Sequence, residues 1–138
     1  MQGISVYQVG DDVSIDKPIY HTFHERNGEY LERENEPNRF RILAEIDDCD
    51  PNFFSGYDLL NDLILDLDLV IEEANLNNDE ELSNHLKEVL VLCKLCVWNV
   101  NDFWLYISPY ERVAPTNYPE KIIEKFKYSI SSAGTKTT

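Results

Sequence analysis

Hydrophobic and polar residues follow two different periods along this chain, and the change comes before its middle. In the first part, short runs of strand-forming residues occur at 4–9, 19–24 and 29–32, and Asn27-Gly28 separates the last two runs. Such runs are typical of β-strands, and Asn-Gly is a strong signal for a tight hairpin turn. This part of the sequence therefore predicts a small antiparallel sheet.

The stretch that follows is ambiguous. Residues 39–46 partly alternate between apolar and polar side chains, which suits a further strand, and a helix is the alternative. Residues 47–56 contain Pro51 and several short polar side chains, so we predict a loop there.

From residue 57 to residue 76 the period becomes helical. Apolar residues recur at steps of three and four, namely Leu59, Leu60, Leu63, Leu67, Val70, Ile71 and Ala74. Residues 62–69 also alternate as in a strand, but twenty residues without Gly or Pro favour a helix. Ile64 and Leu65 fall off the main apolar face, so we expect this helix to be covered on more than one side.

Two more helices are predicted further along. Asn78 or Asp79 can cap a second helix, whose apolar side chains repeat as Leu82, Leu86, Val89, Leu90, Cys93, Val97 and Val100. It should pair with the first helix as an antiparallel hairpin. Pro119 stands in the first turn of a third predicted helix at 119–130.

The predicted fold class is α+β, with a small N-terminal antiparallel sheet of three or four strands packed against the antiparallel helical hairpin and a C-terminal helix. A chain of 138 residues suits one domain. We expect a single globular domain over 1–130 and a flexible tail over 131–138, where the residues are small and polar.

Charge narrows the function classes. The chain has 26 acidic and 12 basic residues, a net charge of −14. That balance argues against direct binding of nucleic acid or of an anionic membrane surface, both of which need basic patches. Three cysteines, an odd count, fit a disulfide framework poorly, and the first residues do not resemble a secretory signal, so we expect a cytoplasmic location.

The acids are concentrated in one third of the chain. Residues 42–86 carry thirteen of them and no Lys or Arg, whereas residues 1–41 and 87–138 have net charges of −3 and +2. Asp58, Asp62 and Asp66 are spaced so that they would form a row on one helix. Such a row is either a solvated face that keeps the protein soluble or a docking surface for a basic partner.

Aromatic residues cluster after the second predicted helix, as Trp98, Phe103, Trp104, Tyr106 and Tyr110. They suit either the core or a contact surface. On the docking hypothesis, the acids form one continuous anionic surface and Trp104 adds dry contact area. The predicted partner-binding residues are Asp58, Asp62, Asp66, Glu73, Asp79, Glu80, Glu81 and Trp104.

No pattern predicts a catalytic residue, a metal site or a cofactor. Cys93 and Cys96 have the C-x-x-C spacing of redox or metal sites, but they also fit a buried helical face. His21 and His24 would point to opposite sides of a strand, so both could not grip one ion. The acidic clusters lack the mid-loop Gly of a calcium loop.

These observations favour a non-enzymatic, acidic binding protein. It would neutralise a basic protein partner by occluding the partner's active or nucleic-acid-binding surface, as an immunity protein does against a toxin such as a nuclease, or as a viral inhibitor does. The alternative is a small regulatory or structural subunit that oligomerises through its helical hairpin. Both a monomer and a homodimer are compatible with the sequence.

Overall fold

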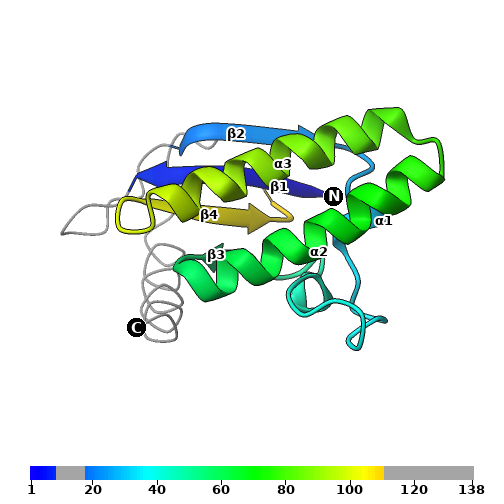
Figure 1. Cartoon of the computed structure of the whole chain (residues 1–138), viewed down its shortest axis with the longest axis horizontal. Coiled ribbons are helices and arrows are strands. Elements are labelled where there is room, and N and C mark those ends of the chain that lie inside the picture. The colour runs from blue at the N-terminus through cyan, green and yellow to red at the C-terminus, as the bar shows by residue number, and fades with distance from the viewer. Residues whose placement is uncertain (9–17, 111–138) are drawn as a thin grey trace.

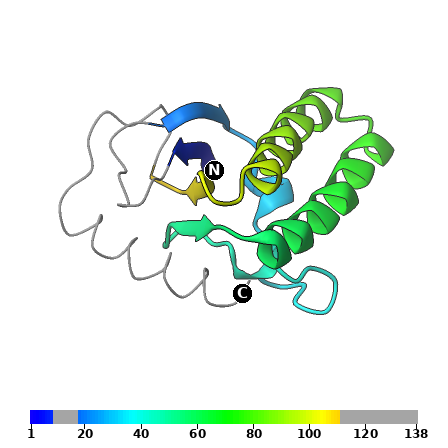
Figure 2. The same cartoon turned by 60° about the vertical axis from the view of Figure 1, so that its left-hand side comes forward.

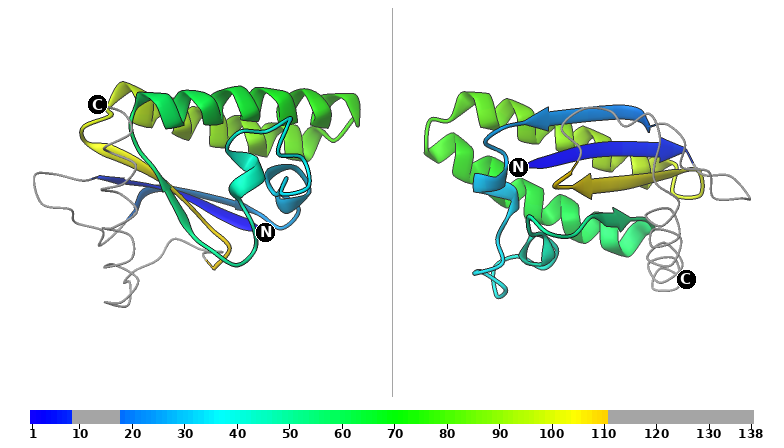
Figure 3. Two further views of the ribbon diagram at one scale, coloured as in Figure 1. Left: turned by 90° about the horizontal axis from the view of Figure 1, so that it is seen from below. Right: turned by 180° about the vertical axis from the view of Figure 1, so that it is seen from behind.

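A four-stranded antiparallel sheet and a helical hairpin form two layers (Figures 1 and 3). The structure is a computed structural model that describes residues 1–8 and 18–110. In chain order, its elements are β1 (Gln2–Gln8), β2 (Pro18–His24), α1 (Gly28–Leu31), a 3₁₀ turn (Leu43–Glu45), β3 (Asn52–Phe54), α2 (Tyr57–Leu76), α3 (Glu80–Trp98) and β4 (Phe103–Ser108). The predicted α+β class, with an antiparallel sheet against a helical hairpin, is confirmed.

The strands lie in the order β2-β1-β4-β3. The sheet therefore combines three strands that precede the helical hairpin in the sequence with one strand, β4, that follows it. In the register, Ile4 pairs with Thr22 on β2 and with Ile107 on β4. Figure 2 shows α3 on the β2 side of the sheet and α2 on the β3 side. This arrangement leaves β2 at one edge, next to α3, and turns the outer side of α2 away from the sheet.

The core lies between the two layers. Alternation along β1 points Ile4 and Val6 toward the helices, where they join Leu105 and Ile107 of β4. The helices contribute the apolar residues at helical spacing, among them Leu60, Leu63, Leu67, Val70, Leu86, Val89 and Cys93. Each such side chain, when fully buried, contributes roughly 1.5–3 kcal/mol to the hydrophobic effect.

The opposite face of the sheet is aromatic and also buried. The rings of Phe53 and Tyr106 stack with centroids 4.7 Å apart, and Tyr7 packs against both. Trp104 lies edge-on to Phe53 at 6.4 Å and is half-buried. Of the five aromatic residues predicted for the core or a contact surface, Phe103, Trp104 and Tyr106 belong to β4. Trp98, at the end of α3, and Tyr110, after β4, are exposed.

The predicted hairpin turn at Asn27-Gly28 is wrong. Residues 29–32 do not return as a strand, because the chain makes the short helix α1 instead. The Asn27 side chain is held by β1: its Oδ1 accepts from the Gln2 N–H at 2.7 Å, and its Nδ2 donates to the Gln2 carbonyl at 2.6 Å. Those bonds fix Asn27 in a helical backbone conformation, with φ at −67°.

Four further segments of the prediction either differ in the structure or lie outside the described residues. Residues 39–46 form neither a strand nor a regular α-helix, but a loop with one 3₁₀ turn. The predicted loop at 47–56 contains the short strand β3. The helix predicted at 119–130 and the tail at 131–138 lie outside the described residues.

Candidate functional site

Arginines from one short segment reach three of the acids that were predicted to dock a partner. This arginine segment, residues 26–41, runs along the hairpin and contains Arg26, Arg33, Arg39 and Arg41. Arg41 approaches Asp62 at 3.2 Å, Arg33 approaches Glu73 at 2.8 Å, and Arg26 approaches Asp79 at 2.6 Å. Arg39 also lies 3.3 Å from Glu73. Much of the expected anionic surface is therefore neutralised within the molecule.

Asp66 is a structural residue. Its side chain is 4 % exposed, and Oδ2 accepts from the backbone N–H groups of Ile42 and Leu43 at 2.7 and 3.0 Å. The N–H of Arg41 adds a longer bond of 3.4 Å to Oδ1. A buried carboxylate is tolerated only when such donors satisfy it. Asp66 therefore fastens the loop before the 3₁₀ turn to α2 and is unavailable to a partner.

Asp79 also serves the fold. It caps α3 by accepting from the Leu82 N–H, as predicted for this position, and it accepts from the Tyr30 hydroxyl at 3.0 Å. Desolvation works to raise the pKa of Asp79, but the hydrogen bonds from Arg26, Tyr30 and the Leu82 N–H outweigh it and lower that pKa. This carboxylate stays charged while it joins α1 to the start of α3.

The remaining predicted site residues do not form one surface either. Glu81 contacts His24 at 2.7 Å, and Trp104 projects from the sheet face that looks away from the helices. Only Asp58 and Glu80 are exposed and make no ion pair with a described residue. The prediction of one continuous anionic surface is wrong, because spacing on a helix does not reveal which residues of a distant segment will pack against it.

A different surface emerges on α2, on the side turned away from the sheet. We define the outer face of α2 by six of the exposed residues of this helix: Asp58, Leu65, Asp68, Leu69, Glu72 and Leu76. Leu65 is 63 % exposed and Leu76 is 76 % exposed. The sequence signal was present, because Leu65 fell off the apolar face, but the expectation that this side would be covered is wrong for Leu65.

The acids of this outer face are free of described cations. No Arg or Lys within residues 1–8 or 18–110 makes an ion pair with Asp58, Asp68 or Glu72. Arg39 lies at the rim, beside Leu69 and Leu76, but its guanidinium is directed to Glu36 and Glu73. The face therefore combines exposed leucines with charges that nothing described neutralises.

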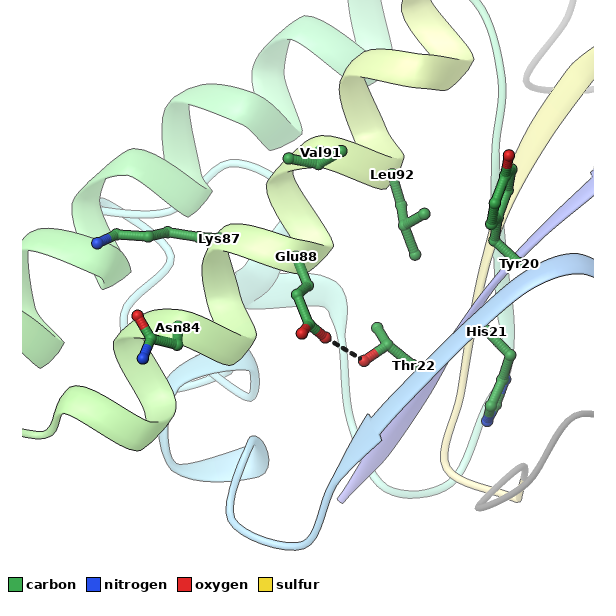
Figure 4. Close-up of a pocket in the computed structure, with 8 residues that line it drawn as sticks. All are labelled: Tyr20, His21, Thr22, Asn84, Lys87, Glu88, Val91 and Leu92. Carbon is green, nitrogen blue, oxygen red and sulfur yellow. Dashed lines mark hydrogen bonds between the residues drawn. The ribbon is translucent and has the colours of Figure 1, made fainter.

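A second surface is a groove between the edge strand β2 and α3, with a volume of about 480 Å³ (Figure 4). Tyr20 of β2 and Val91 and Leu92 of α3 give it an apolar wall, while Lys87 lies on its rim. The Glu88 carboxylate accepts from the Thr22 hydroxyl at 2.8 Å and ties the two elements together. The apolar surface continues toward the end of α3 past Leu95 to Trp98.

Buried polar groups lie near the end of this groove where α3 begins. His85 lies between the Asn27 amide, at 3.2 Å, and the Thr22 hydroxyl, at 3.5 Å, and its ring is 5.5 Å from that of His24. Burial, and then the nearby His24, lower the pKa of His85 to about 4. At neutral pH, His85 is therefore an uncharged structural residue rather than a surface cation.

The described residues assemble no reactive centre. Ser5 and His21 are 2.7 Å apart, but Ser5 is fully buried in the sheet and cannot meet a substrate. Cys93 and Cys96 are buried on α3, as one interpretation of their spacing predicted, and burial raises the pKa of the Cys96 thiol to about 12. Cys49 is exposed, but Asp47 and Asp48 raise its thiol pKa. No group of three potential metal ligands lies together within the described ranges.

Comparison with known proteins adds no assignment, because no family model, no curated protein and no solved structure matches this chain. None of the helices in the described part of the chain combines the length and apolarity needed to cross a membrane. The exposed surfaces of α2 and α3 are therefore the basis for a functional argument.

Proposed function

We propose that this protein is a non-enzymatic binding protein that neutralises a basic protein partner by covering the partner's active or nucleic-acid-binding surface. An immunity protein against a toxin such as a nuclease acts in this way, and so does a viral inhibitor. The docking surface in this proposal is the outer face of α2. The observation that carries it is the combination, on one helix face, of exposed leucines and carboxylates without a described counter-ion.

The apolar part of the face supports contact with another protein. Leu65, Leu69 and Leu76 are all large side chains left in water by the fold. A group of exposed apolar side chains bordered by polar residues is typical of an interaction site. Leu65, Leu69 and Leu76 still expose 63 %, 37 % and 76 % of their surface, so burying the rest in an interface would be worth roughly 0.5–2 kcal/mol for each.

The charged part of the face supports a basic partner. Asp68 and Glu72 are one helical turn apart, and their repulsion costs the helix a few tenths of a kcal/mol. A partner with Lys or Arg side chains at matching positions would remove that repulsion. The field of a protein with net charge −14 would also speed the encounter with a basic protein, by roughly 10-fold to 1,000-fold at low salt.

Rigidity supports occlusion as the mechanism. α2 has 20 residues and is therefore about 30 Å long, enough to lie along an active-site cleft. Its inner side is fixed by core leucines and by Asp66, and Arg33 clamps its last turns through Glu73. A helix held in this way meets a partner without first having to become ordered, which saves entropy on binding.

The test is capture of partners from a lysate of the source cells, at low and at high salt, with mass spectrometry of the bound proteins. The variant carries Asp68→Lys and Glu72→Lys, and the control carries the same change of charge at two exposed acids on other elements, Glu25→Lys and Asp102→Lys. We expect the outer-face variant to lose at least about 10-fold in capture of a basic protein, and the control to keep most of it.

A second readout separates specific inhibition from adhesion of a basic protein to an acidic one. The captured partner should regain its activity when the wild-type protein is replaced by the outer-face variant, but not when it is replaced by the control. If both variants lost capture equally, the binding would depend on the net charge of the protein and not on the outer face of α2. Undiminished capture by the outer-face variant would place the docking surface elsewhere.

A further inference from the structure

The exposed side of α3 carries a stripe of basic and apolar residues. Steps of three and four along the helix bring five exposed residues to one side of it: Asn84, Lys87, Val91, Lys94 and Trp98. We call these five residues the α3 stripe. Val91 is 64 % exposed and Trp98 is 81 % exposed. From residue 84 to residue 98 the stripe is about 21 Å long, which is about four helical turns.

The groove beside the stripe supplies apolar contact area. Val91 and Trp98 share an apolar surface with Tyr20 of the neighbouring strand β2. Tryptophan and tyrosine are the side chains that most often dominate the binding energy of an interface. A ligand that lies along the stripe would therefore bury apolar side chains from both α3 and β2.

The charges of the stripe differ from those of the rest of the molecule. Lys87 and Lys94 are the only Lys or Arg side chains of residues 1–8 and 18–110 that make no ion pair there, because all four arginines contact carboxylates. The only acid between residues 84 and 98 is Glu88, which is turned toward β2 and accepts from the Thr22 hydroxyl, whereas Lys87 is turned away from β2 (Figure 4). Both lysines are therefore open to a ligand of opposite charge. At physiological salt, charges farther apart than about 8 Å are largely screened, so these lysines act on a close ligand despite the net charge of −14.

The spacing of the two lysines indicates the shape of the ligand. They are seven residues apart on one helix, so they lie on the same side of it and about 10.5 Å apart along its axis. Acidic residues seven positions apart on a second helix have the same separation, and two helices pack well along residues spaced by three and four. A β-strand added to β2 fits less well, because Pro18 has no N–H to donate and the pairing of β2 with β1 is irregular near Tyr7.

We propose that the α3 stripe binds an acidic amphipathic helix of a partner protein. Asp or Glu side chains of that helix would meet Lys87 and Lys94, and its apolar side chains would cover Val91 and Trp98. An amphipathic helix that lays its apolar side into a groove is a common mode of protein recognition. The stripe and the outer face of α2 lie on different helices and have opposite charge preferences, so this inference does not depend on the proposed function.

The first test is the selection of helical peptides from a random display library on the full chain. Peptides that also bind the variant with Lys87→Glu and Lys94→Glu are discarded, so that only ligands of the α3 stripe remain. We expect the remaining sequences to combine apolar residues at helical spacing with Asp or Glu seven positions apart. If no sequence remains, or if the remaining sequences lack acids, the proposal is wrong, and neither result bears on the outer face of α2.

The second test follows the binding of one selected peptide by the fluorescence of Trp98. Trp104→Phe leaves Trp98 as the only tryptophan, and its emission should shift to shorter wavelength because the bound peptide removes it from water. Lys87→Glu and Lys94→Glu should each weaken binding by about 10-fold, because each places like charges opposite one another. Arg41→Glu is the control, since it changes the net charge equally at an exposed side chain of another segment, and it should leave binding nearly unchanged. Binding without a shift of the Trp98 emission, or an equal loss in all three variants, would overturn the proposal.

Discussion

Asp66 and Asp68 lie two residues apart on α2, yet their surroundings have little in common. Asp66 is buried, and three backbone N–H groups of the preceding loop donate to it. Asp68 is exposed and makes no ion pair with a described residue. The same contrast holds for the other acids of this helix, since Asp62 and Glu73 meet arginines while Asp58 and Glu72 do not.

This difference teaches that the charge of a segment does not reveal the role of its acids. On the inner side, carboxylates accept hydrogen bonds from backbone N–H groups and form ion pairs with arginines of residues 26–46. Without the carboxylates, these donors would have no such partner. On the outer side, carboxylates contribute nothing visible to the fold, so a role in binding is available to them. The account therefore predicts that variants on the two sides will have separable effects.

The largest expected effect is at Asp66. Asp66→Ala should lower the free energy of unfolding by about 4 kcal/mol, because several buried N–H groups lose their acceptor. Asp68→Ala should change it by no more than about 0.5 kcal/mol. Urea denaturation of the two variants measures both values. If the free energy of unfolding fell by similar amounts in both variants, the proposed difference in role between the two sides of α2 would be wrong.

The next effect is a dependence of stability on pH. Because the pKa of His85 is lowered from 6.5 to about 4 in the folded protein, the unfolded chain binds this proton more tightly. The contribution of His85 is therefore fully present above pH 6.5 and is lost as the pH falls toward 4, by about 3 kcal/mol. Urea denaturation across this range gives the curve.

A control variant isolates the titrating group. His85→Gln keeps a polar side chain near Asn27 and Thr22 but cannot gain the proton, so its stability should fall much less over the same range. The lowered pKa values of Glu36 and Asp79 add a further loss as the pH falls through their ordinary values of 4.5 and 3.8, in the wild type and in this variant alike. A wild-type curve that is flat between pH 6.5 and 4 would contradict the assignment of His85 as neutral.

A smaller difference in stability is expected between variants of two arginines in the arginine segment. Arg33 is buried, donates to Glu36 and Glu73 at 2.9 and 2.8 Å, and lies over the Phe40 ring. Arg33→Met should cost about 2 kcal/mol of stability, since it leaves half-buried Glu73 with only the longer contact to Arg39. Arg41→Met should cost no more than about 0.5 kcal/mol, because the Arg41 side chain is 76 % exposed. Equal costs at the two positions would refute this account of the arginine segment.

Much of the fold was predictable from local pattern. The helical period gave α2 and α3, and the short polar connection with Asp79 gave the cap between them. The failures have one cause, which is contact between distant segments. Asn27 is held by Gln2, 25 positions away, and its turn leads into the helix α1 instead of a return strand. The aromatic run after α3 becomes β4 because it pairs with β1.

The candidate site was predictable only in part. Spacing placed Asp58, Asp62 and Asp66 on one side of a helix, but it could not show that the loop before α2 would cover Asp66 and bring Arg41 to Asp62. The absence of Lys and Arg from residues 42–86 did hold a clue, because the arginines of residues 26–41 precede it directly. The exposed leucines of the outer face were visible in the sequence only as positions off the main apolar face.

The measurement that tests the central claim most directly is a parallel assay of folding and capture for one variant from each side of α2. Asp66→Asn should lower the urea midpoint, while its folded molecules capture the basic partner as the wild type does. The variant with Asp68→Lys and Glu72→Lys should keep the midpoint and lose the capture. If that outer-face variant is folded and captures the partner undiminished, the account is contradicted.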